Sequence, residues 1–292
     1  MIEIHTELVK QLIQDQFPQY AHLPVYPVAK SGNDNRTFHL GDQMTVRLPS
    51  GKDYAPQVEK ESTWLPHLAK HLSLPISAPI EKGKPTKDFP YEWSINKWID
   101  GDTVSYETVE DLTDFASSLA LFLKELQAID ATGGPLAGKH NFHRGGDLAI
   151  YHAETQIALE KLADVFPAPE LSKLWDVAMD SKWEQAPVWV HGDVAVGNIL
   201  VKQGKLCGVI DFGILGVGDP ACDYVMAWTF FEKNSRKVFF DTLHCDDNTR
   251  NRAMGWALWK ALIVYDKQNP TPEVSQWAAY TINEILKDYN SI

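Results

Sequence analysis

The stretch VWVHGDVAVGNILVKQGKLCGVIDFGILGVGDPACDYVMAWTFF, residues 188–231, decides the fold of this chain. Its apolar runs and turn residues predict, in order, a strand, a polar turn, a hairpin, an acidic loop and a helix. Asp193, Asn198 and Asp211 interrupt this otherwise apolar sequence. Because loops carried by a rigid scaffold are where binding and catalytic residues concentrate, we expect these three residues to form a site.

The runs at 198–202 and 206–211 are rich in β-forming residues and are separated by turn residues, which predicts a hairpin. A two-residue turn at 204–205 would place Asn198 directly opposite Asp211. Directly opposed side chains share one face, with Cβ atoms about 4.5 to 5.5 Å apart. An amide oxygen and a carboxylate would therefore converge on one point, as a hard cation such as Mg²⁺ requires.

The motif order is similar to that of protein kinases, in which an Asp serves the attacking hydroxyl and an Asn and a second Asp bind metal. Here the elements are HGD at 191–193, Asn198 and DFG at 211–213, with Gly192 where protein kinases carry Arg. The form HGDxxxxN followed by IDFG and GDPxxD resembles the aminoglycoside phosphotransferase family of small-molecule kinases. SGNDNRTF, VEKESTWLPHLA and SINKWIDG extend the resemblance toward the N-terminus.

The resemblance implies an α+β, bilobal, protein-kinase-like fold. It implies an N-terminal antiparallel-sheet lobe at 1–100, which binds nucleotide and ends in a hinge. A larger, mainly helical lobe at 101–292 would carry the catalytic loop and the acceptor site. The implied activity is transfer of the γ-phosphate of ATP or GTP to a hydroxyl of an aminoglycoside-type or macrolide-type antibiotic, with Mg²⁺ as cofactor and antibiotic resistance as the outcome.

Phosphoryl transfer needs positioning and charge neutralisation, and the resemblance distributes these roles. Asp193 is expected to orient the attacking hydroxyl and to accept its proton late in the reaction. Asn198 and Asp211 are expected to hold the Mg²⁺ that bridges the phosphates. The family's usual Leu, His and Pro after the HGD aspartate are Val, Ala and Val at 194–196, which leaves the carboxylate and amide in place.

Three further polar residues are expected to support the site. His191 is interpreted as a scaffold residue that bonds the acidic loop, with a catalytic base as the alternative. A histidine metal ligand would suit zinc better than magnesium, and no second His lies at ligand spacing. Asp219 precedes Pro220, which suits the N-cap of a helix that begins there. Asp223 is expected to point back toward the active-site loop one turn later.

The N-terminal sequence predicts the nucleotide-binding part, with a helix at 6–17 followed by short strands at 25–29, 36–40 and 43–49. The turn SGNDN tolerates left-handed backbone and can present amides to an anion, although an ordinary hairpin turn has the same composition. The resemblance places this turn over the triphosphate. The predicted contacts are Ser31, Gly32, Asn33 and Asn35.

Arg47 stands where many kinases use Lys to hold the phosphates, and a guanidinium can do so with two hydrogen bonds. The resemblance makes Glu61, in a predicted helix at 57–69, the ion-pair partner of Arg47, with Glu59 as the rival. Asn96 and Trp98 fall in the predicted hinge strand, where backbone groups would recognise adenine. Packing between the lobes is the alternative role for Trp98.

From residue 103 onward the sequence is mainly helical by its 3.6-residue periodicity. Helices are predicted at 109–129, 147–162, 170–180, 250–266 and 273–289. The Gly-rich, basic segment 132–147 is interpreted as a substrate-side loop, with a phosphate cradle as the alternative. The predicted acceptor pocket comprises Trp228, Glu232, Trp256 and Trp259.

Composition limits the partners. Lysine and arginine number 27 against 39 acidic residues, a formal net charge of −12, which disfavours nucleic acid and favours a cationic ligand. The three cysteines lack paired metal-ligand spacing, so we expect reduced, structural thiols. The sequence contains neither an apolar run of membrane-spanning length nor a secretion signal, which predicts no membrane association and a cytoplasmic location.

Two other functions are compatible with the same motifs. A metabolite kinase of the same fold would phosphorylate an amino alcohol or a sugar derivative. A nucleotide-binding pseudokinase would explain Arg47 and the altered loop at 194–196. Measuring nucleotide consumption with a panel of antibiotics and metabolites distinguishes the metabolite kinase from the antibiotic kinase. Nucleotide binding without turnover of any acceptor would identify the pseudokinase.

Overall fold

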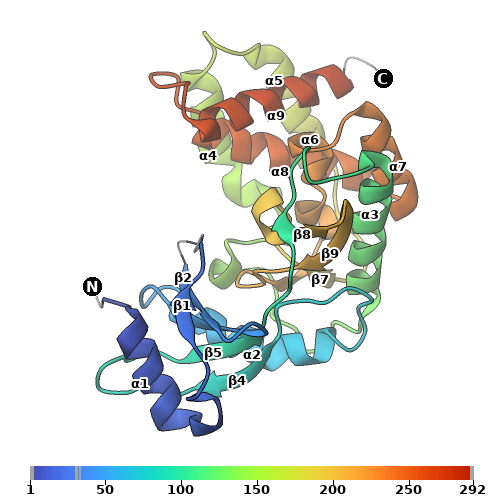
Figure 1. Cartoon of the computed structure of the whole chain (residues 1–292). Coiled ribbons are helices and arrows are strands. Elements are labelled where there is room, and N and C mark those ends of the chain that lie inside the picture. The colour runs from blue at the N-terminus through green and yellow to red at the C-terminus, as the bar shows by residue number, and fades with distance from the viewer. Residues whose placement is uncertain (1–2, 30–31, 33, 290–292) are drawn as a thin grey trace. The chain divides into compact units, whose positions relative to one another are not determined.

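The structure is a computed structural model that describes residues 3–29, 32 and 34–289. The chain divides into two compact units (Figure 1). The first comprises Met1–Asp102 and Cys207–Ile214, and the second comprises Thr103–Leu206 and Leu215–Ile292. The segment 207–214, which carries Asp211, thus belongs to the same unit as the N-terminal sheet.

An antiparallel five-stranded sheet forms the centre of the first unit, accompanied by helices α1 (Thr6–Gln16) and α2 (Ala55–Leu68). The strands, in spatial order, are β1 (Val25–Pro27), β2 (Asn35–Leu40), β3 (Met44–Pro49), β5 (Trp93–Lys97) and β4 (Pro79–Gly83). On β3, Arg47 pairs with Thr37 of β2 on one side and with Ser94 of β5 on the other. The backbone of Arg47 is therefore fixed by strands on both sides.

The apolar face of α1 completes the core of the first unit. Its buried residues recur at the spacing of an amphipathic helix. The Nδ1 atom of His5 accepts the N–H of Leu8 and so caps the N-terminus, while Pro18 follows the last turn. The predicted helix at 6–17 is confirmed to within one residue. The buried core of this unit comprises Leu8, Val9, Leu12, Ile13, Phe38, Leu40, Val46, Leu48, Phe89, Trp93 and Ile95.

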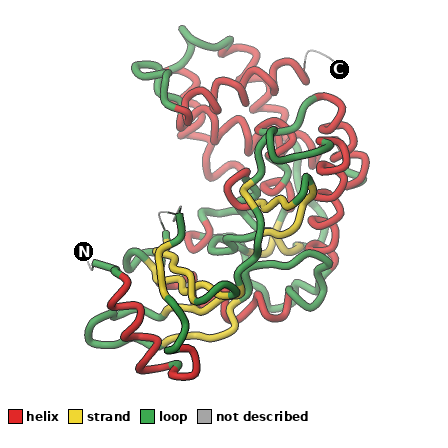
Figure 2. Tube along the Cα trace, in the orientation of Figure 1, coloured by secondary structure: helices red, strands yellow, loops and turns green. Residues whose placement is uncertain are grey.

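Helices dominate the second unit (Figure 2). They are α3 (Leu112–Ala128), α4 (His152–Lys161), α5 (Ala168–Asp180), α6 (Met226–Thr229), α7 (Lys233–Leu243), α8 (Asp247–Val264) and α9 (Glu273–Tyr289). Short strands β7 (Val188–Val190) and β10 (Gly216–Gly218) pair antiparallel, with Trp189 opposite Val217. The sheet of the first unit and the helices of the second confirm the predicted α+β class.

Helix α8 is the core helix of the second unit. Most of its side chains are buried, and it contacts α4, α5 and α9. It begins three residues before the predicted start at Arg250, because Asp246 caps it by accepting the N–H of Thr249 at 2.8 Å. In the part of the chain that the structure describes, neither this helix nor any other has the length and hydropathy needed to cross a bilayer.

Two elements differ from the sequence-based expectation. Helix α7 was not predicted, because its buried face includes Ser235 and Arg236 and so lacks a continuous apolar stripe. The segment after Asp219 forms a short 3₁₀ helix, Pro220–Asp223, rather than an α-helix. Asp219 still caps it, through a hydrogen bond from the N–H of Ala221.

The predicted hairpin register at Asn198 is wrong. Strands β8 (Ile199–Lys202) and β9 (Lys205–Val209) leave Gln203 and Gly204 as the turn, with φ angles of 52° and 79°. Two positive φ values define a type I′ turn, which shifts the register from that of the predicted turn at 204–205. Asp211 lies beyond the end of β9 and has a φ of 63°, so pairing within the hairpin does not position its side chain.

Candidate active site

One buried carboxylate holds the backbone that precedes Asp193. Asp223 accepts the N–H of His191 through Oδ2 and the N–H of Gly192 through Oδ1, each at 2.7 Å. Burial raises the pKa of Asp223, and the neighbouring His191 ring and these two N–H groups oppose the rise. Gly192 has a φ of 87°, a conformation that favours glycine. The HGD turn is thus fixed from the interior of the second unit.

Asp193 itself is exposed and is held by His191 and Asn198. Its N–H donates to Nδ1 of the buried His191 at 3.1 Å. The Nδ2 of Asn198 donates to the Asp193 carbonyl at 3.0 Å and to Oδ2 of its carboxylate at 2.9 Å. Among the described residues, Oδ1 of Asp193 and the amide oxygen of Asn198 have no hydrogen-bond partner. Two oxygen atoms of this pair are therefore left for ligands.

Asp219 is buried and supports the same region through Arg252 of α8. Its Oδ2 lies 2.6 Å from Nε of Arg252, and its Oδ1 lies 3.1 Å from Nη2. A two-point contact between a guanidinium and a carboxylate is geometrically restrictive. Asp219 therefore ties the 3₁₀ helix after the DFG segment to the central helix of the second unit.

In the first unit, Arg47 contacts two carboxylates. Its Nη1 lies 3.0 and 3.1 Å from the two oxygens of Glu61, and its Nη2 lies 3.2 Å from Oδ1 of Asp211. The Arg47 and Glu61 side chains are 12% and 4% exposed, whereas Asp211 is 40% exposed. Burial raises the pKa of Glu61, and the positive charge of Arg47 opposes the rise. Asp211 is thus the accessible member of this group.

The other glutamate considered for Arg47 has a different partner. Glu59 forms an ion pair with Lys82 of β4. Because Glu59 and Glu61 are two positions apart on α2, they point to different sides of the helix. Glu61 therefore faces β3 and Arg47, and Glu59 faces β4.

The predicted phosphate-binding turn is only partly described, because Ser31 and Asn33 lie outside the described residues. Gly32 accepts a hydrogen bond from Arg36 through its carbonyl, and a Cβ built on it would meet no atom within 4 Å. Asn35 begins β2 and is buried. Asp34 accepts a hydrogen bond from Gln57 of α2 at 3.1 Å, which links the turn to the helix that carries Glu61.

The two predicted hinge residues are engaged within the first unit. Asn96 is buried, and its Nδ2 donates to the carbonyl of Ser77 at 2.6 Å. The backbone N–H of Trp98 donates to the carbonyl of Gln43 at 2.8 Å. This N–H is therefore already used within the sheet, and recognition of adenine by the other backbone groups of 96–98 stays a prediction. The Trp98 ring is 37% exposed and makes an edge contact with His39.

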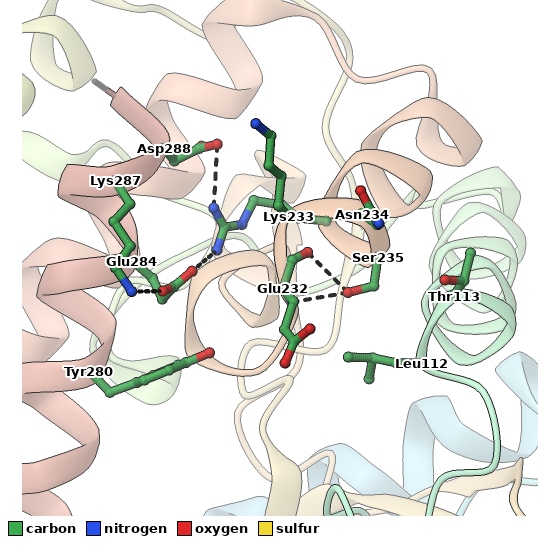
Figure 3. A pocket seen from close by; sticks show the side chains of 11 residues that line it. Leu112, Thr113, Glu232, Lys233, Asn234, Ser235, Tyr280, Glu284, Lys287 and Asp288 are labelled. Carbon is green, nitrogen blue, oxygen red and sulfur yellow. Dashed lines mark hydrogen bonds and ion pairs between the residues drawn. The ribbon is translucent and has the colours of Figure 1, made fainter. Parts of the chain in front are cut away.

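The four predicted acceptor residues lie in different surroundings. Trp228 is fully buried and donates to Asp288 at 3.0 Å, so it cannot line an acceptor site. Glu232 lines a cavity of about 840 Å³ (Figure 3), whose lining residues include neither Asp193 nor the two other tryptophans. That cavity is bounded by Leu112, Thr113, Glu232, Lys233, Asn234, Ser235, Arg236, Tyr280, Glu284, Lys287 and Asp288.

Trp256 and Trp259 lie on α8 and contact a residue that the sequence analysis did not select. The guanidinium carbon of Arg144 lies 5.0 Å from the centroid of each ring. The Nε of Arg144 donates to the carbonyl of Gly192 at 3.1 Å. Tyr151 stacks on Trp259 with a centroid distance of 3.9 Å. The tryptophans are thus connected, through Arg144, to the backbone beside Asp193.

Lys260 is a second cation on this side of the second unit. Burial lowers the pKa of Lys260, as does the charge of Arg144, while Asp193 and Glu154 oppose the shift. The sequence signal for Arg144 was a basic residue in HRGG, inside the predicted substrate-side loop. The signal for Lys260 was a single lysine within an apolar run of α8.

The residues available to Mg²⁺ suit a hard cation by donor type. Asn198 retains an amide oxygen, and Asp211 presents a half-exposed carboxylate. Carboxylate and amide oxygens together with water are the usual ligands of magnesium. The described residues contain no group of three or more histidine, cysteine, aspartate or glutamate side chains that could hold a metal ion, so a bound Mg²⁺ would take its remaining ligands from water and the phosphates.

The model of the phosphotransferase enzyme family matches residues 26–256. An aminoglycoside 3'-phosphotransferase of Escherichia coli is 25% identical over 177 residues, which cover 55% of this chain and 61% of the relative. The uncharacterized protein YcbJ of Bacillus subtilis (strain 168) is 25% identical over 213 residues, 68% of this chain and 67% of that protein. The matches therefore span about two thirds of the length of these curated relatives.

Solved structures share the fold. The GDP complex of aminoglycoside 2'-phosphotransferase-IIIa superposes with a TM-score of 0.69 at 18% identity, covering 99% of this chain and 100% of the other. The macrolide 2'-phosphotransferase MphH of Brachybacterium faecium superposes with a TM-score of 0.61 at 19% identity, covering 95% and 97%. These likenesses confirm the predicted fold. Because the family model matches most of its length, the chain belongs to the phosphotransferase enzyme family.

Proposed function

We propose that this phosphotransferase moves the γ-phosphate of ATP or GTP to a hydroxyl of a small molecule, with an aminoglycoside-type or macrolide-type antibiotic as the first acceptor class to test. Relatives named as aminoglycoside phosphotransferases and fold neighbours named as aminoglycoside and macrolide phosphotransferases support this class. Neighbours described as GDP and ATP complexes support the nucleotide.

Asp193 would orient the acceptor hydroxyl and take up its proton. The observation that carries this role is its pairing with Asn198, which holds one carboxylate oxygen at 2.9 Å and leaves the other without a partner among the described residues. A fixed carboxylate with one open oxygen can align a hydroxyl for attack at the cost of little reorganisation. Proton transfer comes late because the phosphoryl transition state is loose.

Nucleotide binding would involve Arg47, Asp211 and Asn198. Arg47 is anchored by Glu61, so its guanidinium is a fixed positive charge for phosphate oxygens. The available oxygens of Asp211 and Asn198 are the proposed Mg²⁺ ligands. Magnesium, when bound, would neutralise charge on the transferred phosphate. Gly32 and Asn35, together with Ser31 and Asn33, which lie outside the described residues, stay candidates for the turn that covers the triphosphate.

The experiment is a nucleotide-consumption assay with ATP and GTP against aminoglycosides, macrolides and hydroxylated metabolites. Asp193→Ala should reduce turnover by about 10³-fold, which is within the range lost when a catalytic base is removed. The dissociation constant of the Mg²⁺-nucleotide should stay within about twofold, because Asp193 serves the acceptor. Asp176→Ala, an exposed aspartate of α5, is the matched control and should behave like the unmodified protein.

The second candidate is a metabolite kinase. Arg144 and Lys260 provide two positive charges on the side of the second unit that carries Asp193, which disfavours a polycationic acceptor. Turnover with a neutral or anionic hydroxylated metabolite, and none with any antibiotic of the panel, would support this candidate. Nucleotide binding without turnover of any acceptor would instead support a pseudokinase.

A further inference from the structure

The peptide group between Gly192 and Asp193 is held at both of its polar atoms. Its N–H donates to Nδ1 of His191 at 3.1 Å, and its carbonyl accepts the Nε–H of Arg144 at 3.1 Å. A peptide group is planar, so fixing its donor and its acceptor fixes its rotation about the chain. The direction in which Asp193 leaves the backbone is therefore set by His191 on one side and Arg144 on the other.

Aromatic rings hold the Arg144 guanidinium in place. Trp256 and Trp259 each lie 5.0 Å from the guanidinium carbon, and the two rings are nearly perpendicular, at 83°. Cation–π contacts at this distance are attractive, and they are stronger where the cation is shielded from water. Trp259 is in turn fixed by stacking on Tyr151 and by a 2.8 Å hydrogen bond to Glu154. Helix α8 thus sets the position of the side chain that reaches the catalytic loop.

The backbone that carries Arg144 is fixed as well. Asn141 is fully buried, and its Nδ2 donates to the carbonyl of Arg144 at 2.9 Å. Gly145 has a φ of 82° and lies so close to Gly218 of β10 that a Cβ on Gly218 would be 2.0 Å from the Gly145 carbonyl oxygen. The Gly145 carbonyl also accepts the N–H of Asp219 at 2.8 Å. These contacts explain the glycines at 145 and 218 by close backbone packing.

We propose that Arg144 is a positioning residue for the phosphoryl transfer: it fixes the Gly192–Asp193 peptide so that the Asp193 carboxylate meets the acceptor hydroxyl in line with the phosphate. The inference rests on the proposed function of Asp193. Arg144 acts through the Gly192 carbonyl and not through a reacting atom. Its contribution is therefore to the turnover number and not to nucleotide affinity.

The role requires a guanidinium. Arg144 uses Nε for the Gly192 carbonyl and Nη1 for the Phe142 carbonyl at 3.2 Å, while its planar group lies against both indoles. Lysine offers positive charge and donors but neither the fork nor the flat face. Arg144→Lys should thus recover part, and not all, of what Arg144→Ala loses.

The test uses the full chain and two measurements. Hydrogen exchange of peptides covering 188–200 should become on the order of tenfold faster in Arg144→Ala, because one hydrogen bond from a charged donor is lost. Turnover should fall about 10- to 100-fold with the best acceptor of the panel, since small misplacements of a catalytic group have effects of this size. The affinity of Arg144→Ala for Mg²⁺-ADP and Mg²⁺-GDP should change less than twofold. Guanidinium ion added at millimolar concentration should restore part of the turnover that this variant loses.

Arg250→Ala is the matched control, because Arg250 also lies over an aromatic ring, Phe240, at 5.2 Å and pairs with Asp288. It should leave exchange at 188–200 and turnover near those of the unmodified protein. Exchange at 188–200 in Arg144→Ala equal to that of the control would overturn the inference, as would a loss confined to nucleotide affinity. If no acceptor is turned over, the proposed function fails, while the exchange result still decides whether Arg144 holds the loop.

Discussion

The Nη2 atom of Arg47 lies 3.2 Å from Oδ1 of Asp211, while its Nη1 contacts both carboxylate oxygens of Glu61. Arg47→Ala would leave the 4%-exposed Glu61 side chain without its counter-charge. Breaking a buried pair in this way costs about 3 to 5 kcal/mol. We expect urea denaturation to show a loss of unfolding free energy of this size. Arg36→Ala, at an exposed arginine of β2, should change it by less than about 0.5 kcal/mol; equal losses in the two variants would contradict the assignment.

Asp211→Asn should weaken binding of the Mg²⁺-nucleotide without changing the free energy of unfolding much. Because the Asp211 side chain is 40% exposed and Arg47 keeps Glu61, the unfolding free energy should change by less than about 1 kcal/mol. The affinity for Mg²⁺-ADP should fall at least about tenfold, since a charged oxygen ligand is lost. Affinity for ADP in the presence of EDTA should hardly change. Calorimetric titrations with and without Mg²⁺ test this, and an equal loss in both would assign Asp211 to the nucleotide instead of the metal.

Much of the first unit could be predicted from the sequence because its signals are local. The spacing of Leu8, Val9, Leu12 and Ile13 predicts α1, and Pro18 predicts its end. HGDxxxxN and DFG are local signals too, and the roles that they give to Asp193, Asn198 and Asp211 stay predictions. The resemblance predicted the pairing of Arg47 with Glu61, and the structure confirms it. The rival Glu59 lies on another side of α2 and pairs with Lys82.

The remaining errors come from tertiary contacts that leave no local pattern. The turn falls at Gln203 and Gly204 because Gln203 adopts a left-handed conformation. A turn with Gly204 first and Lys205 second was equally compatible with the sequence. Trp228 and Trp259 are equally aromatic in the sequence and both are buried, but Trp228 bonds to Asp288 and Trp259 contacts Arg144. Arg144 was inside a segment recognised as basic and Gly-rich, yet its contact with Gly192 spans 48 residues of chain.

Gly218→Ala should destabilise the second unit. An added Cβ would lie 2.0 Å from the Gly145 carbonyl oxygen, a backbone atom that cannot rotate away. Overpacking of this kind costs about 1 to 3 kcal/mol. Gly51→Ala is the control, because its Cβ would meet nothing within 4 Å. Thermal unfolding of both variants tests the contact, and a melting temperature of Gly218→Ala equal to that of Gly51→Ala would show that the two segments are not closely packed.

Lys60 should make stability depend on pH in the alkaline range. Burial lowers the pKa of Lys60 to about 8, with Glu61 opposing the shift, whereas an unfolded chain has the ordinary lysine value of 10.5. Between about pH 8 and pH 10.5 the unfolded state binds more protons than the folded state. The contribution of Lys60 to the free energy of unfolding therefore rises with pH from about 8 to about 10.5, and it is constant below about pH 8.

Lys60→Met removes this contribution together with the cost of keeping a charge half-buried. The variant should therefore be more stable than the unmodified protein at pH 7, and the difference should shrink as the pH rises toward 10. Urea denaturation of both proteins at pH 7, 8, 9 and 10 measures the difference. Lys70→Met, at an exposed lysine just beyond α2, should shift the whole curve without changing its slope. Parallel curves for Lys60→Met and the unmodified protein would mean that Lys60 keeps its proton throughout, so that burial does not govern its charge.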